Sequence, residues 1–307
     1  MSLKEEQRPG NTGLAKVAVQ FSASTLVVKI ATFAKPETVR GNFMRTYIFI
    51  LIILLTKDIF AQDYSSLGKS INYSDIYRKA KRFQNIDNAL LTPDQVLYID
   101  LTVDKDGLNY QKFVDNHGKF KNLRKLIIDN RWYQIDLKPV PDISVFKDLE
   151  FLQIFNLPNL NFDILSDLSN LKYLSLNACE LKTLPSSIIK MKQLEFLDLS
   201  VNYLSALPDN ISEIISLKEI DLTNNRFIEI PKQIEFVKNL LYLDINNAEG
   251  DGYLINGKAL CKNTLTVYPA ILSNCKNLKK VSLYKVIIDK PTKEKLKAEF
   301  KTIRFTF

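Results

Sequence analysis

Four segments of this 307-residue chain begin with leucine and follow one another at a constant interval of 23 residues. They start at Leu171, Leu194, Leu217 and Leu240. The first reads LKYLSLNACELKTLPSSIIKMKQ, and the next two follow its pattern L-x-x-L-x-L-x-x-N/C-x-L-x-x-L-P-x-x-I. Self-similarity at a fixed period of about 20 to 50 residues is typical of repeat architectures, in which each unit is one supersecondary element. The interval therefore predicts a stacked array.

Each copy starts with alternating apolar and polar residues, which is the pattern of a β-strand with one buried face. In the first copy, Leu174 and Leu176 alternate with Tyr173 and Ser175. Pro185 then suits the first turn of a short helix, where its missing N–H is not needed. A single copy buries too little apolar surface to offset the entropy of ordering its backbone. Neighbouring copies must therefore stack and pair their strands.

This pattern strongly resembles that of the leucine-rich repeat family, of the type with a Leu-Pro step. The resemblance implies an α/β fold: a leucine-rich repeat solenoid, or horseshoe, with a concave parallel β-sheet and short convex helices. After each strand the chain turns, and an amide side chain there can pair backbone groups that face inward. These structural repeat-turn positions hold Cys179, Asn202 and Asn225. We expect Cys179 to be a buried structural thiol.

Weaker copies extend the array in both directions, to give about nine rungs over residues 96–307. The further strands are expected at Val96, Leu123, Leu149, Leu278 and the final IRFTF. Residues 62–95 are expected to form an N-terminal segment and a helical cap, with Ser74 as a candidate N-cap, because an exposed end of the stack would be apolar. This cap resembles that of exported bacterial leucine-rich repeat proteins.

One interval breaks the period. The distance from Leu240 to Leu278 is 38 residues, which is 15 more than the repeat. Insertions in repeat proteins map to loops and are often functional. The irregular interval therefore predicts a loop insertion near residues 248–262, which is either functional or a plain longer loop.

The segment MRTYIFILIILLTKDIFA, residues 44–61, has the order of parts of a secretory signal peptide. An arginine precedes the apolar run, and Ala61 supplies a small residue for cleavage. Residues 46–56 carry no charge, but they are only 11 residues, whereas a membrane-spanning helix needs about 20. We predict a signal peptide at residues 44–61; a short uncleaved anchor and a buried core strand are the alternatives.

Residues 1–43 share no register with the repeats. We interpret them as disordered or as a start-site artefact, with translation beginning at Met44. A signal at this point predicts a chain that is secreted, periplasmic or at the cell surface, with no stable membrane span after cleavage. If the segment is not a signal, the chain is cytoplasmic or membrane-anchored.

The residues that alternate with the buried leucines are expected on the concave face. Aromatic side chains there have no core to fill, and such residues are enriched at interfaces. Aspartates on adjacent rungs would lie about 4.8 Å apart and repel one another, so a basic group would relieve them. The predicted ligand-binding residues are Phe151, Tyr173, Phe196, Tyr242, Asp198, Asp221 and Asp244. The alternative is that the family simply tolerates aspartate at this position.

The sequence holds few residues that could support catalysis or the binding of a metal or cofactor. The chain has one histidine, three cysteines, no glycine-rich phosphate loop and no Cys-x-x-Cys, so we expect no enzyme, no cofactor and no metal site. In an exported chain, Cys261 and Cys275 could form a disulfide across the irregular interval. The net charge is +8, but basic and acidic residues are interleaved and the concave face is acidic, so nucleic acid is not an expected partner.

The function favoured by the sequence is therefore a non-enzymatic, exported recognition module that binds a protein or peptide ligand through its concave face. The alternative is an intracellular leucine-rich repeat signalling scaffold or regulatory subunit, which the same type of repeat also resembles.

Overall fold

The computed structural model describes residues 80–307 apart from residues 159, 248–253, 256–257, 260 and 267–269. The predictions for residues 1–43, for the signal segment at 44–61 and for a helix cap at Ser74 lie outside these residues. The chain divides into two compact units, Met1–Ser66 and Leu67–Phe307. All described residues belong to the second unit.

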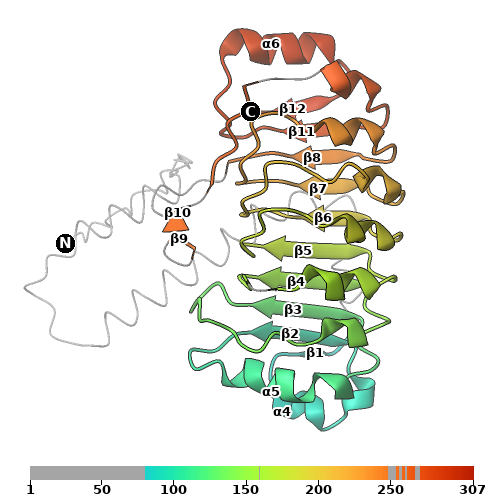
Figure 1. The fold of residues 1–307 in the computed structure, drawn as a ribbon, viewed down its shortest axis with the longest axis vertical. Coiled ribbons are helices and arrows are strands. Elements are labelled where there is room, and N and C mark those ends of the chain that lie inside the picture. The colour runs from blue at the N-terminus through green and yellow to red at the C-terminus, as the bar shows by residue number, and fades with distance from the viewer. Residues whose placement is uncertain (1–79, 159, 248–253, 256–257, 260, 267–269) are drawn as a thin grey trace, which may run out of the picture. The chain divides into compact units, whose positions relative to one another are not determined.

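Ten parallel strands form one open sheet whose order follows the sequence, with β11 next to β8 (Figure 1). They are β1 (Arg82–Phe83), β2 (Tyr98–Thr102), β3 (Lys125–Asp129), β4 (Phe151–Phe155), β5 (Tyr173–Asn177), β6 (Phe196–Asp198), β7 (Glu219–Asp221), β8 (Tyr242–Asp244), β11 (Lys280–Ser282) and β12 (Arg304–Thr306). The nine predicted strands are β2 to β8, β11 and β12. The predicted α/β solenoid is confirmed.

Short helices follow the strands on one side of the sheet. Most are 3₁₀ helices: η1 (Pro93–Gln95), η2 (His117–Lys119), η3 (Ile143–Val145), η4 (Phe162–Asp167), η5 (Ser186–Lys190), η6 (Ile211–Glu213), η7 (Lys232–Phe236) and η8 (Ala270–Asn274). The α-helices lie toward the ends of the stack: α4 (Ile86–Leu90) and α5 (Leu108–Asn116) near β1, and α6 (Lys290–Glu299) beyond β12 (Figure 1). Among the described helices, none is long and apolar enough to cross a membrane.

The main core lies between the sheet and these helices. The leucines predicted to point inward, such as Leu174 and Leu176, are fully buried and share one cluster with Ile188 of η5 and Ile211 of η6. Each rung therefore buries its apolar strand residues against its own helix and against its neighbours, as the solenoid requires.

We expected residues 62–95 to form an N-terminal segment and a helical cap. In the described part of that range, a strand precedes the helix: Arg82 and Phe83 form β1, which pairs in parallel with β2. Phe83 is buried in the core, and the helix α4 begins only at Ile86. Its N-cap is Asn85, whose side chain accepts a hydrogen bond from the Asn88 N–H (3.1 Å). Pairing with β2 and the burial of Phe83 account for a strand at this position.

The irregular interval carries a small element of its own. Strands β9 (Leu254–Ile255) and β10 (Lys258–Ala259) pair antiparallel and form a sheet separate from the ten-stranded one. Asn263 then returns the chain to the repeat, as described below.

Candidate functional site

The side of the ten-stranded sheet opposite the 3₁₀ helices, which we call the open face, carries all seven predicted ligand-binding residues. The strand register aligns them in two rows. The first row is Arg82, Tyr98, Lys125, Phe151, Tyr173, Phe196, Glu219, Tyr242, Lys280 and Arg304. The second row is Asp100, Ile127, Gln153, Ser175, Asp198, Asp221, Asp244, Ser282 and Thr306.

Three aromatic rings of the first row stack on one another. The ring centroids of Phe151 and Tyr173 lie 4.0 Å apart, and those of Tyr173 and Phe196 lie 4.4 Å apart, with the planes within 7° of parallel. The strand spacing of about 4.8 Å accounts for this stack, because identical positions on adjacent rungs align. Phe151 and Phe196 are buried, whereas Tyr173 and Tyr242 are half-buried and pack against them. The structure thus brings the four predicted aromatics into one cluster.

The three aspartates of the second row are also buried, and each is held by its own strand end. Asp198 accepts hydrogen bonds from the N–H (2.8 Å) and the hydroxyl of Ser200, and from the hydroxyl of Ser175 (2.6 Å). Asp221 accepts from the Thr223 N–H (2.8 Å), and Asp244 accepts from the Asn246 amide (3.2 Å). The residue two positions after each aspartate therefore fixes its carboxylate.

Burial raises the pKa of all three aspartates. For Asp221, repulsion from Asp198 and Asp244 raises the pKa further, well above its usual range. Burial raises the pKa of Asp244 to about 6, although Lys280 acts in the opposite direction. The pKa of Asp198 is raised by burial, while its bonds to the two serines lower it. The centre of the open face is thus a place where added positive charge is favourable.

The β1–β4 part of the open face is basic and aromatic instead. Arg82 forms an ion pair with Asp100 (2.5 Å), whose carboxylate also accepts from the Tyr98 hydroxyl (3.2 Å). The ammonium of Lys125 lies over the rings of Tyr98 (4.6 Å) and Phe151 (4.1 Å). Burial lowers the pKa of Lys125 to about 8. The open face is therefore basic at β1 to β4, acidic at β6 to β8, and basic again at Lys280 and Arg304 of the first row.

The repeat-turn residues lie behind the strands and serve the fold. The Asn225 amide donates to the carbonyl oxygens of Leu199 (2.9 Å), Leu222 (3.1 Å) and Thr223 (3.2 Å), and its oxygen accepts from the Leu204 N–H (3.0 Å). Asn202 makes the same set of contacts one rung earlier. Cys179 is buried, its thiol lies 3.5 Å from the Asn177 carbonyl oxygen, and burial raises its pKa to about 12.

Asn263 fills the same position in the next rung and was missed by the sequence reasoning. Its amide donates to the carbonyl oxygens of Leu222 (3.0 Å) and Asn246 (3.2 Å), and its oxygen accepts from the Phe227 N–H (3.1 Å). The regular period places Ala248 there, and Ala248 has no amide. The signal was present in the sequence: Leu265 follows Asn263 by two residues, as Leu204 follows Asn202.

The structure has all three cysteines as free thiols, and a disulfide between Cys261 and Cys275 stays a prediction. Cys275 is buried, and its thiol lies 3.7 Å from the carbonyl oxygen of Ile234. Cys261 instead accepts a hydrogen bond from Nε of Arg226 (3.3 Å). The two sulfurs thus face different partners in this structure.

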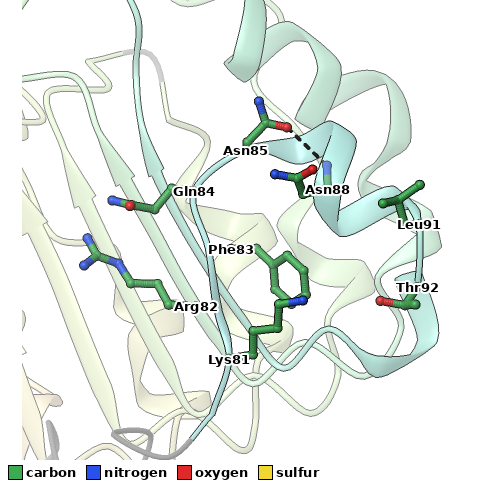
Figure 2. Close-up of a pocket in the computed structure, with 8 residues that line it drawn as sticks. All are labelled: Lys81, Arg82, Phe83, Gln84, Asn85, Asn88, Leu91 and Thr92. Carbon is green, nitrogen blue, oxygen red and sulfur yellow. Dashed lines mark hydrogen bonds between the residues drawn. The ribbon is translucent and has the colours of Figure 1, made fainter.

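One hollow, of about 300 Å³, lies beside β1 and away from the predicted residues. Figure 2 shows Phe83 on one side of β1, toward α4, and Arg82 and Gln84 on the other. Apart from Lys81 and Arg82, the described residues around the hollow are uncharged. Within the described residues, no group of three histidine, cysteine, aspartate or glutamate side chains could hold a metal ion.

The repeat, the parallel sheet and the asparagine hydrogen bonds together define the fold as a leucine-rich repeat solenoid. A leucine-rich repeat protein of Leptospira interrogans is similar in structure, with 20% identity and a TM-score of 0.38, over 74% of this chain and 69% of its own. Internalin C2 of Listeria monocytogenes is also similar, with 15% identity and a TM-score of 0.42, over 62% and 73%. No protein-family model and no curated protein matches the sequence.

Proposed function

We propose that this protein is an exported, non-enzymatic binding protein that takes a basic, aromatic-bearing protein segment or peptide on its open face. Solenoids of this class use their extended sheet surface for protein interaction. The observation that carries the proposal is the row of three buried aspartates beside stacked aromatic rings. A lysine or arginine of the ligand would offset the repulsion between the carboxylates, and Tyr173 and Tyr242 would supply apolar contact.

Selection from a displayed library of random peptides tests the binding. The purified chain is expected to enrich peptides that carry lysine or arginine next to an aromatic residue. The variant Asp198→Asn, Asp221→Asn, Asp244→Asn removes the three ionisable carboxyl groups and keeps the shape of the face, so we expect at least about tenfold weaker binding of those peptides. The matched control is Asp87→Asn, Glu213→Gln, Glu294→Gln, which removes three exposed charges elsewhere.

Equal enrichment by the face variant and the wild type would refute binding at the open face. The circular dichroism spectrum and the melting temperature of each variant exclude unfolding as the cause of any loss.

We propose that the protein is exported because residues 44–61 resemble a signal peptide. A C-terminally tagged chain expressed from its own start should leave the cytoplasm and begin at Gln62. Replacing Ile53 by arginine interrupts the apolar run and should keep the chain inside the cell. A full-length chain that stays in the cytoplasm would favour the intracellular scaffold instead.

A further inference from the structure

Charge is distributed unevenly along the stack. Residues 276–307 hold ten basic and three acidic residues, a net charge of +7. Residues 80–275 hold 21 basic and 25 acidic residues, a net charge of −4. Figure 1 shows that β11, α6 and β12, which residues 276–307 form with their loops, lie together at one end of the stack. We call residues 276–307 the basic end.

The charge of the basic end faces solvent. Its exposed basic side chains are Lys276, Lys279, Lys285, Lys290, Lys295, Lys297, Lys301 and Arg304. Two of the three acidic residues have other contacts: Asp289 accepts from the Thr292 N–H (2.7 Å), and Glu294 lies 3.6 Å from Lys297. Ion pairs this exposed contribute little and are screened by salt. The acidic residues therefore offset only a small part of the positive charge.

The helix α6 gathers part of this charge on one side. Lys290, Lys293 and Lys297 follow one another at intervals of three and four residues, which places them along one side of the helix. The ammonium groups of Lys293 and Lys297 both lie over the ring of Phe307, at 5.1 and 5.6 Å from its centroid. Because two ammonium groups held over one ring repel each other, an anion beside them is favourable.

An exposed apolar side chain accompanies the lysines. Ile287 is 91% exposed, which makes it the most exposed large apolar residue of the described part of the chain. It lies in the loop between β11 and α6, three residues before Lys290. Leu296 and Phe300 keep the apolar side of α6 in the core. A partner at the basic end therefore meets lysines and one free aliphatic side chain.

These features favour an anionic lipid surface over nucleic acid. Nine of the ten basic residues are lysines, which act as compact hydrated charges, whereas the planar fork of arginine suits recognition of bases. Clusters of four to eight basic residues bind anionic lipid headgroups. An aliphatic side chain such as Ile287 can enter the boundary between headgroups and acyl chains, a contact that the phosphate backbone of DNA does not provide.

We propose that the basic end docks on the surface of an anionic phospholipid membrane. The lysines of α6 lie against the headgroups, Ile287 enters the boundary with the acyl chains, and the apolar side of α6 stays in the core. Docking by one end leaves β2 to β8 accessible to other partners. It does not depend on the proposed ligand binding, because it uses a different part of the repeat unit.

Flotation of the full chain with lipid vesicles tests the docking. We expect binding to vesicles of phosphatidylglycerol and phosphatidylcholine in equal parts. Binding to vesicles of phosphatidylcholine alone should be weaker by at least about tenfold. Added sodium chloride should also weaken the binding, because salt screens charges at the surface.

Four substitutions in the basic end sharpen the test. The variant Lys290→Gln, Lys293→Gln, Lys297→Gln, Lys301→Gln should bind the anionic vesicles at least about tenfold more weakly. The matched control removes four exposed lysines elsewhere in the stack, Lys105→Gln, Lys121→Gln, Lys182→Gln, Lys232→Gln, and should bind as the wild type does.

Two smaller variants keep the test decisive if the fourfold variant fails to fold. Ile287→Ser should weaken the binding several-fold with an unchanged circular dichroism spectrum and melting temperature. Lys290→Gln with Lys301→Gln, which spares the two lysines over Phe307, should do the same.

Three outcomes would overturn the proposal. Equal binding to anionic and neutral vesicles would do so, as would equal losses in the two fourfold variants. All variants carry residues 44–61, so binding through that apolar segment would give these results. Binding to a short DNA duplex without binding to either vesicle would make nucleic acid the partner. Failure of the peptide selection with positive flotation would refute the proposed function and leave the docking intact.

Discussion

At the level of single residues, the buried amides behind the strands hold neighbouring rungs together. Asn225 contacts backbone groups of two consecutive rungs, Leu222 in its own rung and Leu199 and Leu204 in the preceding one. Because these groups are shielded from water, each loses its partner without a substitute when the amide is removed. The repeat pattern placed Asn202 and Asn225 at these turns from spacing alone.

We therefore predict that Asn225→Ala lowers the free energy of unfolding by about 3 kcal/mol. Urea titration followed by circular dichroism measures the change. Asn239→Ala is the control, because Asn239 is exposed and makes a single bond to the Ile215 carbonyl oxygen. Similar losses in the two variants would contradict a special role for the turn amide.

A second prediction concerns pH. Burial raises the pKa of Asp244 to about 6, above its unfolded value of about 3.9. The native state therefore binds this proton more tightly, so the contribution of Asp244 to wild-type stability falls as the pH rises from about 4 to about 6. The asparagine side chain in the variant Asp244→Asn does not titrate. The stability of this variant relative to wild type should rise between pH 4 and pH 7, by an amount on the order of 2 kcal/mol.

Asp289→Asn serves as a control of opposite sign. Asp289 caps α6 and accepts from the Thr292 N–H, which lowers its pKa. The contribution of the Asp289 carboxylate to the free energy of unfolding is present above the unfolded pKa and is lost as the pH falls. This variant should therefore lose stability relative to wild type at pH 7 more than at low pH. Parallel behaviour of the two variants in urea titrations at several pH values would contradict the account.

At the level of elements, regular strands were predictable and irregular ones were not. Alternating leucines located β2 to β8, because each inward side chain must meet the core. β1 has only two residues, too few for a period, and its strand state depends on pairing with β2. Asn263 lies outside the 23-residue register, so only its contacts reveal its role. The burial of Phe151 and Phe196 depends on stacking with the rings of neighbouring rungs, which the pattern of a single strand does not encode.

The role of Asn263 predicts which deletion the chain tolerates. Removing residues 248–262 joins Asn247 to Asn263 and restores the 23-residue interval with an asparagine at the turn. Asn263 already donates its N–H to the Asn247 side chain (2.8 Å). We expect a melting temperature within a few degrees of wild type, since shortening a surface loop costs little.

The matched control removes residues 263–277. This deletion has the same length and restores the same interval, but it removes Asn263, Leu265 and η8. It should unfold the rung and lower the melting temperature markedly. If both deletions behave alike, the turn amide of this rung is not supplied by Asn263.

At the level of the whole repeat unit, stability depends on closing the two ends of the sheet. Among the described strands, β12 is the last of the ten-stranded sheet, and α6 follows β11 and packs on β12 and the last core residues (Figure 1). Leu296 of α6 is 3% exposed and joins the main core. A bare strand edge is a template for pairing with other chains.

Leu296→Asp should therefore release α6, lower stability by about 3 kcal/mol or more, and promote aggregation. Thermal unfolding and light scattering measure the two effects. Ile287→Asp is the control, since Ile287 is 91% exposed and its replacement should change neither. Unchanged light scattering for Leu296→Asp would argue that the edge of β12 is protected in another way.

The contacts of Asn263 also have a consequence for protein engineering and for divergence of the sequence. Asn263 completes the turn of this rung although it lies fifteen positions later than the regular repeat would place it. The array therefore accommodates an insertion at this point without a change in strand register. Foreign loops, epitopes or small domains could enter between Asn247 and Asn263 while the strands on both sides keep their alignment. For the same reason, the segment between Asn247 and Asn263 can diverge in sequence and length while the rest of the array stays unchanged.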